Sequence, residues 1–151
     1  ASTVNTIIGQ RLVRRVANRR DAYWSTPLET QMIKETVGHL LPKTKEEVAN
    51  ISADLGYKDL PLAGQTAYTL VKGRDTPATP HGYAGRAGIF EVMDVTEAIQ
   101  NLIVKRATSA EIQHKAIEQG MITMRQDGYL KALTGITTLE EVNRVTSADT
   151  A

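Results

Sequence analysis

The sequence has no cysteine among its 151 residues. This absence excludes disulfide bonds, thiolate zinc sites and cysteine nucleophiles. Aromatic residues are scarce at 5%, and the formal net charge is only +1, so no global field directs the chain to nucleic acid or an anionic membrane. We find neither an apolar run near the length of a membrane span, about 20 residues, nor a signal-peptide pattern, which predicts a cytoplasmic protein.

The residues that are present have an ordinary globular composition, with 41% hydrophobic side chains. Over residues 2–19 the apolar side chains recur at helical spacing, which predicts a helix that is weakened at Gly9. Arginines occupy its other face. Because this pattern already runs at the first residues, we expect the chain to be a fragment of a longer protein.

Threonine followed three residues later by glutamate predicts helix starts at several places. The capping boxes are Thr26 with Glu29, Thr44 with Glu47, and Thr108 with Glu111; further helices are predicted near Thr96, after residue 122 and at Thr137 or Thr138. Two short strands are predicted over residues 66–72 and 87–95. The expected fold is α-rich, mainly α with a small β element, and has a C-terminal helical bundle plus a short β hairpin.

The apolar members of the last helices are the candidate core of that bundle. They are Ile112, Ile117, Met121, Met124, Leu130, Leu133, Ile136, Leu139 and Val142.

Glycines at equal spacing in "HGYAGRAGIFEV" resemble a phosphate-binding loop, with Arg86 among them. Such a loop needs backbone N–H groups converging at the start of a helix, whereas Gly88 leads into a β-rich run. No Gly-Lys-Ser/Thr pattern occurs in the chain. We therefore interpret the glycines as residues that give the backbone conformational freedom at the start of a strand.

The other candidate sites have structural explanations. The arginines between Arg11 and Arg20 are interpreted as a solvated face rather than a phosphate-binding surface. The three histidines, His39, His81 and His114, lie in different elements and form no metal-ligand pattern. Glu46–Glu47 and Glu140–Glu141 lie in first helical turns, where capping explains them. We therefore predict no catalytic, cofactor-binding or metal-binding residue.

Several stretches together resemble one family. They are "STVNTIIGQRLVRR", "HGYAGRAGIFEVMDVTEAIQNLI" and "QGMITMRQDGYLKALTGITTLEEVNRVT", which are similar in order and spacing to the C-terminal end of the PilB/GspE type of type IV pilus assembly and type II secretion ATPases. The resemblance covers the chain outside roughly residues 23–80. It implies that the phosphate-binding loop and the magnesium motif precede this chain.

Members of that family commonly carry two Cys-x-x-Cys pairs that hold zinc. The matching positions here are Ala17, Arg20, Asp75 and Ala78, so this chain has a zinc-free version of the knuckle. If both pairs converge, Arg20 and Asp75 would face each other and partly replace the metal; the alternative is that they are unpaired surface residues.

The resemblance implies a C-terminal structural and regulatory subdomain of a hexameric motor ATPase that powers type IV pilus assembly. A type II secretion ATPase subdomain, or an independent helical module that binds nucleic acid or anionic lipid through its arginines, are the alternatives. The chain alone is expected not to be an enzyme and to hold no cofactor, while ATP and magnesium are implied for the parent protein.

The implied partners are the upstream ATPase core, neighbouring subunits of a homohexamer and an inner-membrane platform protein, with no nucleic acid. The implied location is cytoplasmic and peripheral to the inner membrane. We divide the chain into a helix leading from the missing core (1–22), a knuckle-like region with extra helices and a short β element (23–95), the helical bundle (96–146) and a frayed tail (147–151).

Overall fold

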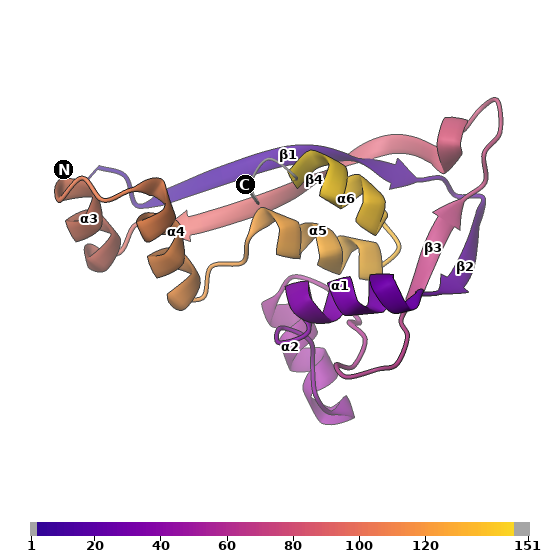
Figure 1. Ribbon diagram of the computed structural model, residues 1–151, viewed down its shortest axis with the longest axis horizontal. Helices are drawn as coiled ribbons and strands as arrows, with labels where there is room; N and C mark the ends of the chain where they lie inside the picture. The colour runs from indigo at the N-terminus through magenta and orange to yellow at the C-terminus, as the bar shows by residue number, and fades with distance from the viewer. Residues whose placement is uncertain (1–2, 147–151) are drawn as a thin grey trace.

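The computed structural model describes residues 3–146, which contain two antiparallel sheets of two strands each. Strands β1 (Thr6–Val16) and β4 (Tyr83–Asp94) form a long ribbon. Strands β2 (Arg20–Trp24) and β3 (Thr69–Gly73) pair at one end of it. The ribbon runs along the long axis of the molecule (Figure 1).

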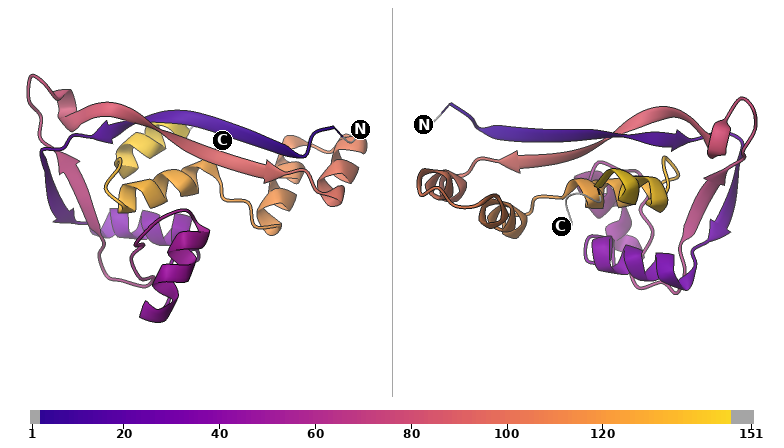
Figure 2. Two further views of the ribbon diagram at one scale, coloured as in Figure 1. Left: turned by 180° about the vertical axis from the view of Figure 1, so that it is seen from behind. Right: turned by 45° about the horizontal axis from the view of Figure 1, so that its top comes forward.

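The helices lie on one side of this ribbon (Figure 2). They are α1 (Pro27–Val37), α2 (Val48–Asp54), α3 (Glu97–Val104), α4 (Ser109–Glu118), α5 (Met124–Leu133) and α6 (Leu139–Thr146), with 3-10 turns at Lys45–Glu47 and Pro80–Gly82. Helix α5 packs on β4 and α6 on β1, while α1 packs on α5. Within the described residues, no helix is long and apolar enough to cross a membrane.

The fold is mixed α/β, with 42% helix and 24% strand, so the α-rich prediction is wrong. The main cause is residues 6–16, which were predicted as part of a helix and form β1. This stretch is rich in β-branched residues such as Ile7, Ile8 and Val13, which favour an extended backbone. The spacing of its apolar residues fits both a helix and a strand. Pairing with β4, which lies far along the chain, favours the strand.

The predictions made from local helix and strand signals agree with the structure better than the predicted fold class does. The capping boxes at the starts of α1 and α4 form with both reciprocal bonds, and Thr96 caps α3. The box predicted at Thr44 is wrong: its side chain makes no capping bond, and the Glu47 carboxylate accepts the Lys43 amide instead. The two predicted strands correspond to β3 and to the C-terminal part of β4, whereas β2 was not predicted.

The main core lies between the ribbon, α5, α6 and α1. Its buried members are Val13, Ile33, Val37, Leu41, Leu60, Tyr68, Leu70, Ile89, Met124, Tyr129, Leu130, Ala132, Leu139 and Val142. Residues from β1, β4 and both C-terminal helices thus meet residues of the 27–70 region in one cluster, so that region is part of the same core.

The C-terminal bundle and short hairpin of the predicted fold class are replaced by two helix pairs beside the ribbon. Helix α3 pairs with α4 near the N-terminal end of β1, and α5 pairs with α6 at its centre (Figure 1). Of the candidate core, Met124, Leu130, Leu139 and Val142 are buried, but Ile117 is 43% exposed. The division of the chain into segments remains a prediction, and the tail 147–151 lies outside the described residues.

Candidate interaction surface

The two sides of the β1–β4 ribbon carry alternate residues, because side chains alternate along a strand. We define two faces at the centre of the ribbon, over residues 8–13 and 87–92. The side toward the helices is the covered face; its paired residues there are Gly9, Arg11, Val13, Ala87, Ile89 and Glu91. We call the other side the open face; its paired residues are Ile8, Gln10, Leu12, Gly88, Phe90 and Val92.

Helices α5 and α6 are fixed to the covered face by both apolar and polar contacts. Val13 and Ile89 are completely buried. The Glu91 carboxylate accepts the backbone amide of Met124 at 3.1 Å, at the start of α5. The Arg11 guanidinium donates to the carbonyl of Val145 at 2.6 Å, at the end of α6.

The open face is apolar but accessible in this chain. Ile8 is 64% exposed, Leu12 46%, Phe90 40% and Val92 48%. A Cβ atom on Gly88 would come within 2.8 Å of both the Phe90 ring and the Gln10 side chain, so the Phe90 ring lies close over the backbone at Gly88. Lys131 of α5 lies over one edge of this face, with its Nζ 5.5 Å from the Phe90 ring centroid. Exposed apolar side chains gathered on one side of a ribbon are typical of a contact with another protein segment.

Glu141 links α6 to β1. Its carboxylate is 1% exposed and accepts the Arg14 amide at 3.0 Å, the Arg14 guanidinium at 2.7 Å and the Arg144 guanidinium at 2.7 Å. Burial alone would raise its pKa, but the hydrogen bonds from Arg144 and Arg14 outweigh it and lower the pKa to about 2. The Arg14 guanidinium also lies over the Tyr83 ring, 4.2 Å from its centroid.

This geometry corrects one prediction made for Glu141. The Thr138 hydroxyl accepts the Glu141 amide at 3.1 Å, so Thr138 is the capping residue of α6. The Glu141 carboxylate does not close a capping box; it holds two arginines instead. The helix predicted for the arginines of residues 11–20 is also wrong, because β1 occupies residues 6–16. Arg14 is bonded internally, whereas Arg15 and Arg19 are exposed as predicted.

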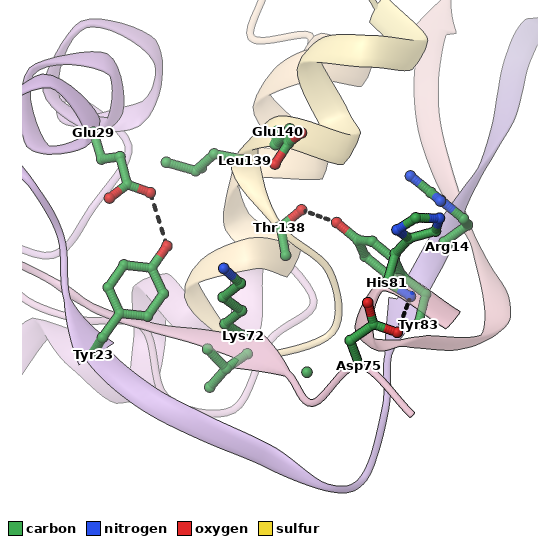
Figure 3. Close-up of a pocket in the computed structure, with 12 residues that line it drawn as sticks. Arg14, Tyr23, Glu29, Lys72, Asp75, His81, Tyr83, Thr138, Leu139 and Glu140 are labelled. Atoms are coloured by element: carbon green, nitrogen blue, oxygen red, sulfur yellow. Dashed lines mark hydrogen bonds between the residues drawn. The ribbon is translucent and has the colours of Figure 1, made fainter. Parts of the chain in front are cut away.

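A polar groove of about 630 Å³ opens between β3, the start of α1 and the start of α6 (Figure 3). Tyr23 donates to Glu29 at 2.8 Å, and the hydroxyls of Tyr83 and Thr138 are bonded at 2.7 Å. Burial, followed by the hydrogen bond to Glu29, raises the pKa of Tyr23, so this phenol remains protonated at neutral pH. These contacts join polar side chains of the groove to one another and connect α1 to β2 and α6 to β4.

Metal ligands do not gather in this groove or elsewhere in residues 3–146: no group of three or more His, Cys, Asp or Glu side chains is placed to hold an ion. The three histidines lie in separate parts of the fold. His81 lines the groove, and His114 pairs with Glu118 at 3.6 Å on α4.

The glycine-rich stretch enters β4, as predicted, and is not at a helix N-terminus. His81 has a φ of 58°, and the amide of this residue donates to Asp75 at 3.0 Å. Gly82, at φ 83°, lies so close to Gly73 that a Cβ on it would be 2.3 Å from the Gly73 carbonyl. Two backbones therefore touch at the end of the groove.

The predicted pair of Arg20 with Asp75 is wrong. The Arg20 guanidinium donates to the carbonyls of Val16 and Ala17, each at 3.0 Å, and to that of Gly135. It therefore joins the turn after β1 to the turn between α5 and α6. The exposed ion pair of this region is formed by adjacent residues, Asp21 and Arg74, at 2.9 Å.

Asp127 on α5 forms a second polar junction at the outer edge of β4. Its carboxylate accepts the Phe90 amide at 2.9 Å, the Tyr57 hydroxyl at 2.6 Å and the Lys131 ammonium at 2.7 Å. Burial, followed by the bond to Asp127, raises the pKa of Tyr57. The carboxylate thus joins the ribbon, α5 and the loop after α2.

Both junctions were missed from the sequence, although each has a local signal. Glu141 and Arg144 are three residues apart, and Asp127 and Lys131 are four apart, which are the spacings of helical ion pairs. Nothing local indicated that the same carboxylates would also bind backbone amides of β1 and β4.

Comparison with known proteins identifies the class of the chain. Residues 1–144 match the model of a family described as "Type II/IV secretion system protein". Over 146 residues the chain is 33% identical to the type IV pilus assembly ATPase PilB of Pseudomonas aeruginosa, covering 97% of this chain and 22% of that protein. It is 34% identical over 147 residues to the type II secretion system protein E of Xanthomonas campestris pv. campestris, covering 96% and 22%.

The chain therefore belongs to the type II/IV secretion system protein family, and the resemblance inferred from its motifs is confirmed. The match also includes residues 23–80, which the motifs had left outside. A third relative, the PilB ATPase of Myxococcus xanthus, is 30% identical over 152 residues, covering 98% of this chain and 22% of that protein. The chain thus spans about a fifth of the length of these relatives, 22% in each case.

Proposed function

We propose that this chain is a structural and regulatory subdomain of a hexameric motor ATPase that powers type IV pilus assembly. The observation that carries the proposal is the open face, an apolar surface on a chain whose PilB relatives are several times longer. In the parent protein this face packs against the ATPase core, and the subdomain transmits the motion of that core.

The parent protein would use ATP and magnesium, while this chain by itself hydrolyses no ATP. The parent would work in the cytoplasm, at the inner membrane, with an inner-membrane platform protein and five further copies of itself as partners. Type II secretion is the second candidate, favoured by the similarity to the Xanthomonas secretion protein E.

Disruption of the gene in the bacterium that encodes it tests the assignment. We expect surface pili to disappear and secretion of type II substrates to continue. Loss of secretion with normal pili would support the second candidate, and no change in either would contradict both. The disrupted strain carrying the intact gene is the control.

Purified chain provides the biochemical test. We expect no magnesium-dependent ATP hydrolysis by the chain and clear hydrolysis by the full-length parent. Tight, steeply salt-dependent binding of nucleic acid by the chain in a filter assay would instead support an independent binding module. The internal bonds of Arg14 and Arg20 disfavour that outcome.

A further inference from the structure

We propose that helices α3 and α4 form a hinged arm that turns as one unit against the rest of the subdomain. The arm comprises residues 96–121, and we call the rest of the described chain the body. The two helices lie together at one end of the molecule, beside the N-terminal end of β1 (Figure 1). Resting on the function proposed above, this names the element of the subdomain that moves when the ATPase core changes shape.

The arm has buried residues of its own. Ile99 of α3 is 0% exposed and Ala116 of α4 is 3% exposed. Neither belongs to the main core cluster, and no residue of these two fully described helices packs against that cluster. Helices α3 and α4 instead pack on each other. The arm therefore keeps its internal packing when it moves relative to the main core.

The polar contacts of the arm are internal as well. Within residues 3–146, every hydrogen bond and ion pair of residues 97–121 is made to another residue of the arm. The Thr96 hydroxyl donates to the Gln119 side chain at 2.9 Å and joins the two ends of the arm. Helices α5 and α6 differ, because Glu91 and Arg11 bond them to the ribbon. Helices α3 and α4 can thus turn without losing a hydrogen bond to the body.

Both connections between arm and body are short enough to act as hinges. In the first, the Val95 amide is hydrogen-bonded to the body at 2.8 Å, whereas Thr96 already caps α3. In the second, the Met121 amide is hydrogen-bonded within the arm at 3.0 Å, whereas Thr123 already caps α5. Hinges are a few loop residues that absorb the change in φ and ψ. The first hinge is therefore the link from Val95 to Thr96, and the second is Ile122.

Two grooves leave the arm room to turn. One of about 300 Å³ lies between the end of β4 and α4, and Met93, Ile112 and Met121 are among the residues that line it. The other, of about 400 Å³, lies between α4 and the α5–α6 pair, with Gln113 and Met124 in its lining. Met93 borders the first groove from the body and Met121 borders it from the arm. Unbranched methionine side chains can repack as the width of such a groove changes.

The position of the arm in the chain makes it a lever. It follows β4 directly and leads directly into α5, so its two hinges are attached to different elements of the body. A small shift of α5 along the ribbon would change the relative position of the hinges and turn the arm. The far end of the arm would then move further than α5 itself. Motion of the ATPase core that reaches the ribbon or α5 would be amplified in this way.

Distances between spin labels test the hinge, because the chain has no cysteine of its own. The arm–body pair is Lys34→Cys with His114→Cys. The controls are Asn101→Cys with His114→Cys inside the arm, and Lys34→Cys with Glu140→Cys inside the body; all four positions are exposed. By pulsed electron paramagnetic resonance, the arm–body distance distribution should be at least about twice as broad as either control. Equal widths would overturn the proposal.

A matched pair of substitutions locates the second hinge. Ile122→Gly adds backbone freedom at this position and should broaden the arm–body distribution further. Ile136→Gly makes the same change in the turn between α5 and α6, which lies within the body, and should leave the distribution unchanged. Equal broadening by the two variants, or by neither, would contradict the assigned hinge.

The full-length parent tests the link to the proposed function. A parent without other cysteines carries the arm–body pair, is diluted with unlabelled parent, and is measured with ADP and with a non-hydrolysable ATP analogue. The arm–body distance should differ between the two nucleotides, while the body pair stays constant. If the parent hydrolyses ATP and the distance does not change, the arm is not the moving element and the packing function stands. If the parent hydrolyses no ATP, the proposed function fails, and the widths measured in the chain decide whether the arm is hinged.

Discussion

The covered and open faces of the ribbon use alternate residues of the same two strands, yet identical side chains have opposite environments. Ile89 on the covered face is completely buried, while Ile8 on the open face is 64% exposed. The difference in burial does not come from the amino-acid composition of the two faces. It arises because α5 and α6 pack on only one of them. One face is therefore buried within this chain, whereas the apolar side chains of the other remain exposed in it.

The largest expected effect is a difference between two identical substitutions. Ile89→Ala should lower the free energy of unfolding by about 2–5 kcal/mol, because it leaves a cavity in the core. Ile8→Ala, its matched control, should change the isolated chain by no more than about 0.5 kcal/mol. Urea unfolding measures both, and similar losses for the two would mean that the faces are not distinct.

The junction that fixes α6 to the covered face gives the next effect. Glu141→Gln should cost about 1–3 kcal/mol, since charge-assisted bonds to two arginines and to the Arg14 amide are weakened. Glu140→Gln, at the exposed neighbouring position, serves as the control. A Glu141 variant as stable as the Glu140 variant would remove this junction from the account.

Acid should weaken the same junction. The pKa of Glu141 is about 2 in the folded chain against an ordinary value of 4.5. A lowered pKa means that the stabilisation is complete above the unfolded value and is lost as pH falls through the folded value. Between pH 4.5 and pH 2, the stability advantage of the native chain over Glu141→Gln should therefore shrink, as unfolding curves at several pH values would reveal. An advantage that stays constant over this range would contradict the lowered pKa.

The junction at the edge of β4 should have a somewhat smaller effect. Asp127→Asn should cost about 1–2 kcal/mol and speed amide exchange at Phe90, because the charged acceptor for three donors is lost. The exchange rate at Ile89, whose amide points to β1, is the internal control. Unchanged exchange at Phe90 would show that Asp127 does not close this edge.

The smallest effect is expected at the exposed ion pair beside the β1–β2 turn. Arg74→Gln should leave the melting temperature unchanged within error, because both partners of the pair with Asp21 are exposed. Arg20→Gln should lower it clearly, since three carbonyls lose their donor. If the Arg74 variant melts lower than the Arg20 variant, the assignment of the stabilising residue is reversed.

Much of the local structure could be predicted from the sequence, because helix caps depend on residues only three positions apart. Thr26 and Thr108 begin helices as predicted, and glycines mark the start of β4. The strand β1 could not be recognised, because the spacing of its apolar residues fits both a helix and a strand. Its pairing partner, β4, lies far along the chain. The open face was missed for the same reason: it can be recognised only once the register with β4 is known.

The absence of cysteine allows the most direct test of the central claim that the open face is covered in the parent protein. A single cysteine is introduced as Leu12→Cys in the chain and in a full-length parent whose other cysteines have been replaced. Maleimide labelling should be at least about tenfold slower in the parent than in the chain, while Asn50→Cys on exposed α2 labels equally in both. Equal labelling of the cysteine at position 12 in chain and parent would contradict the claim.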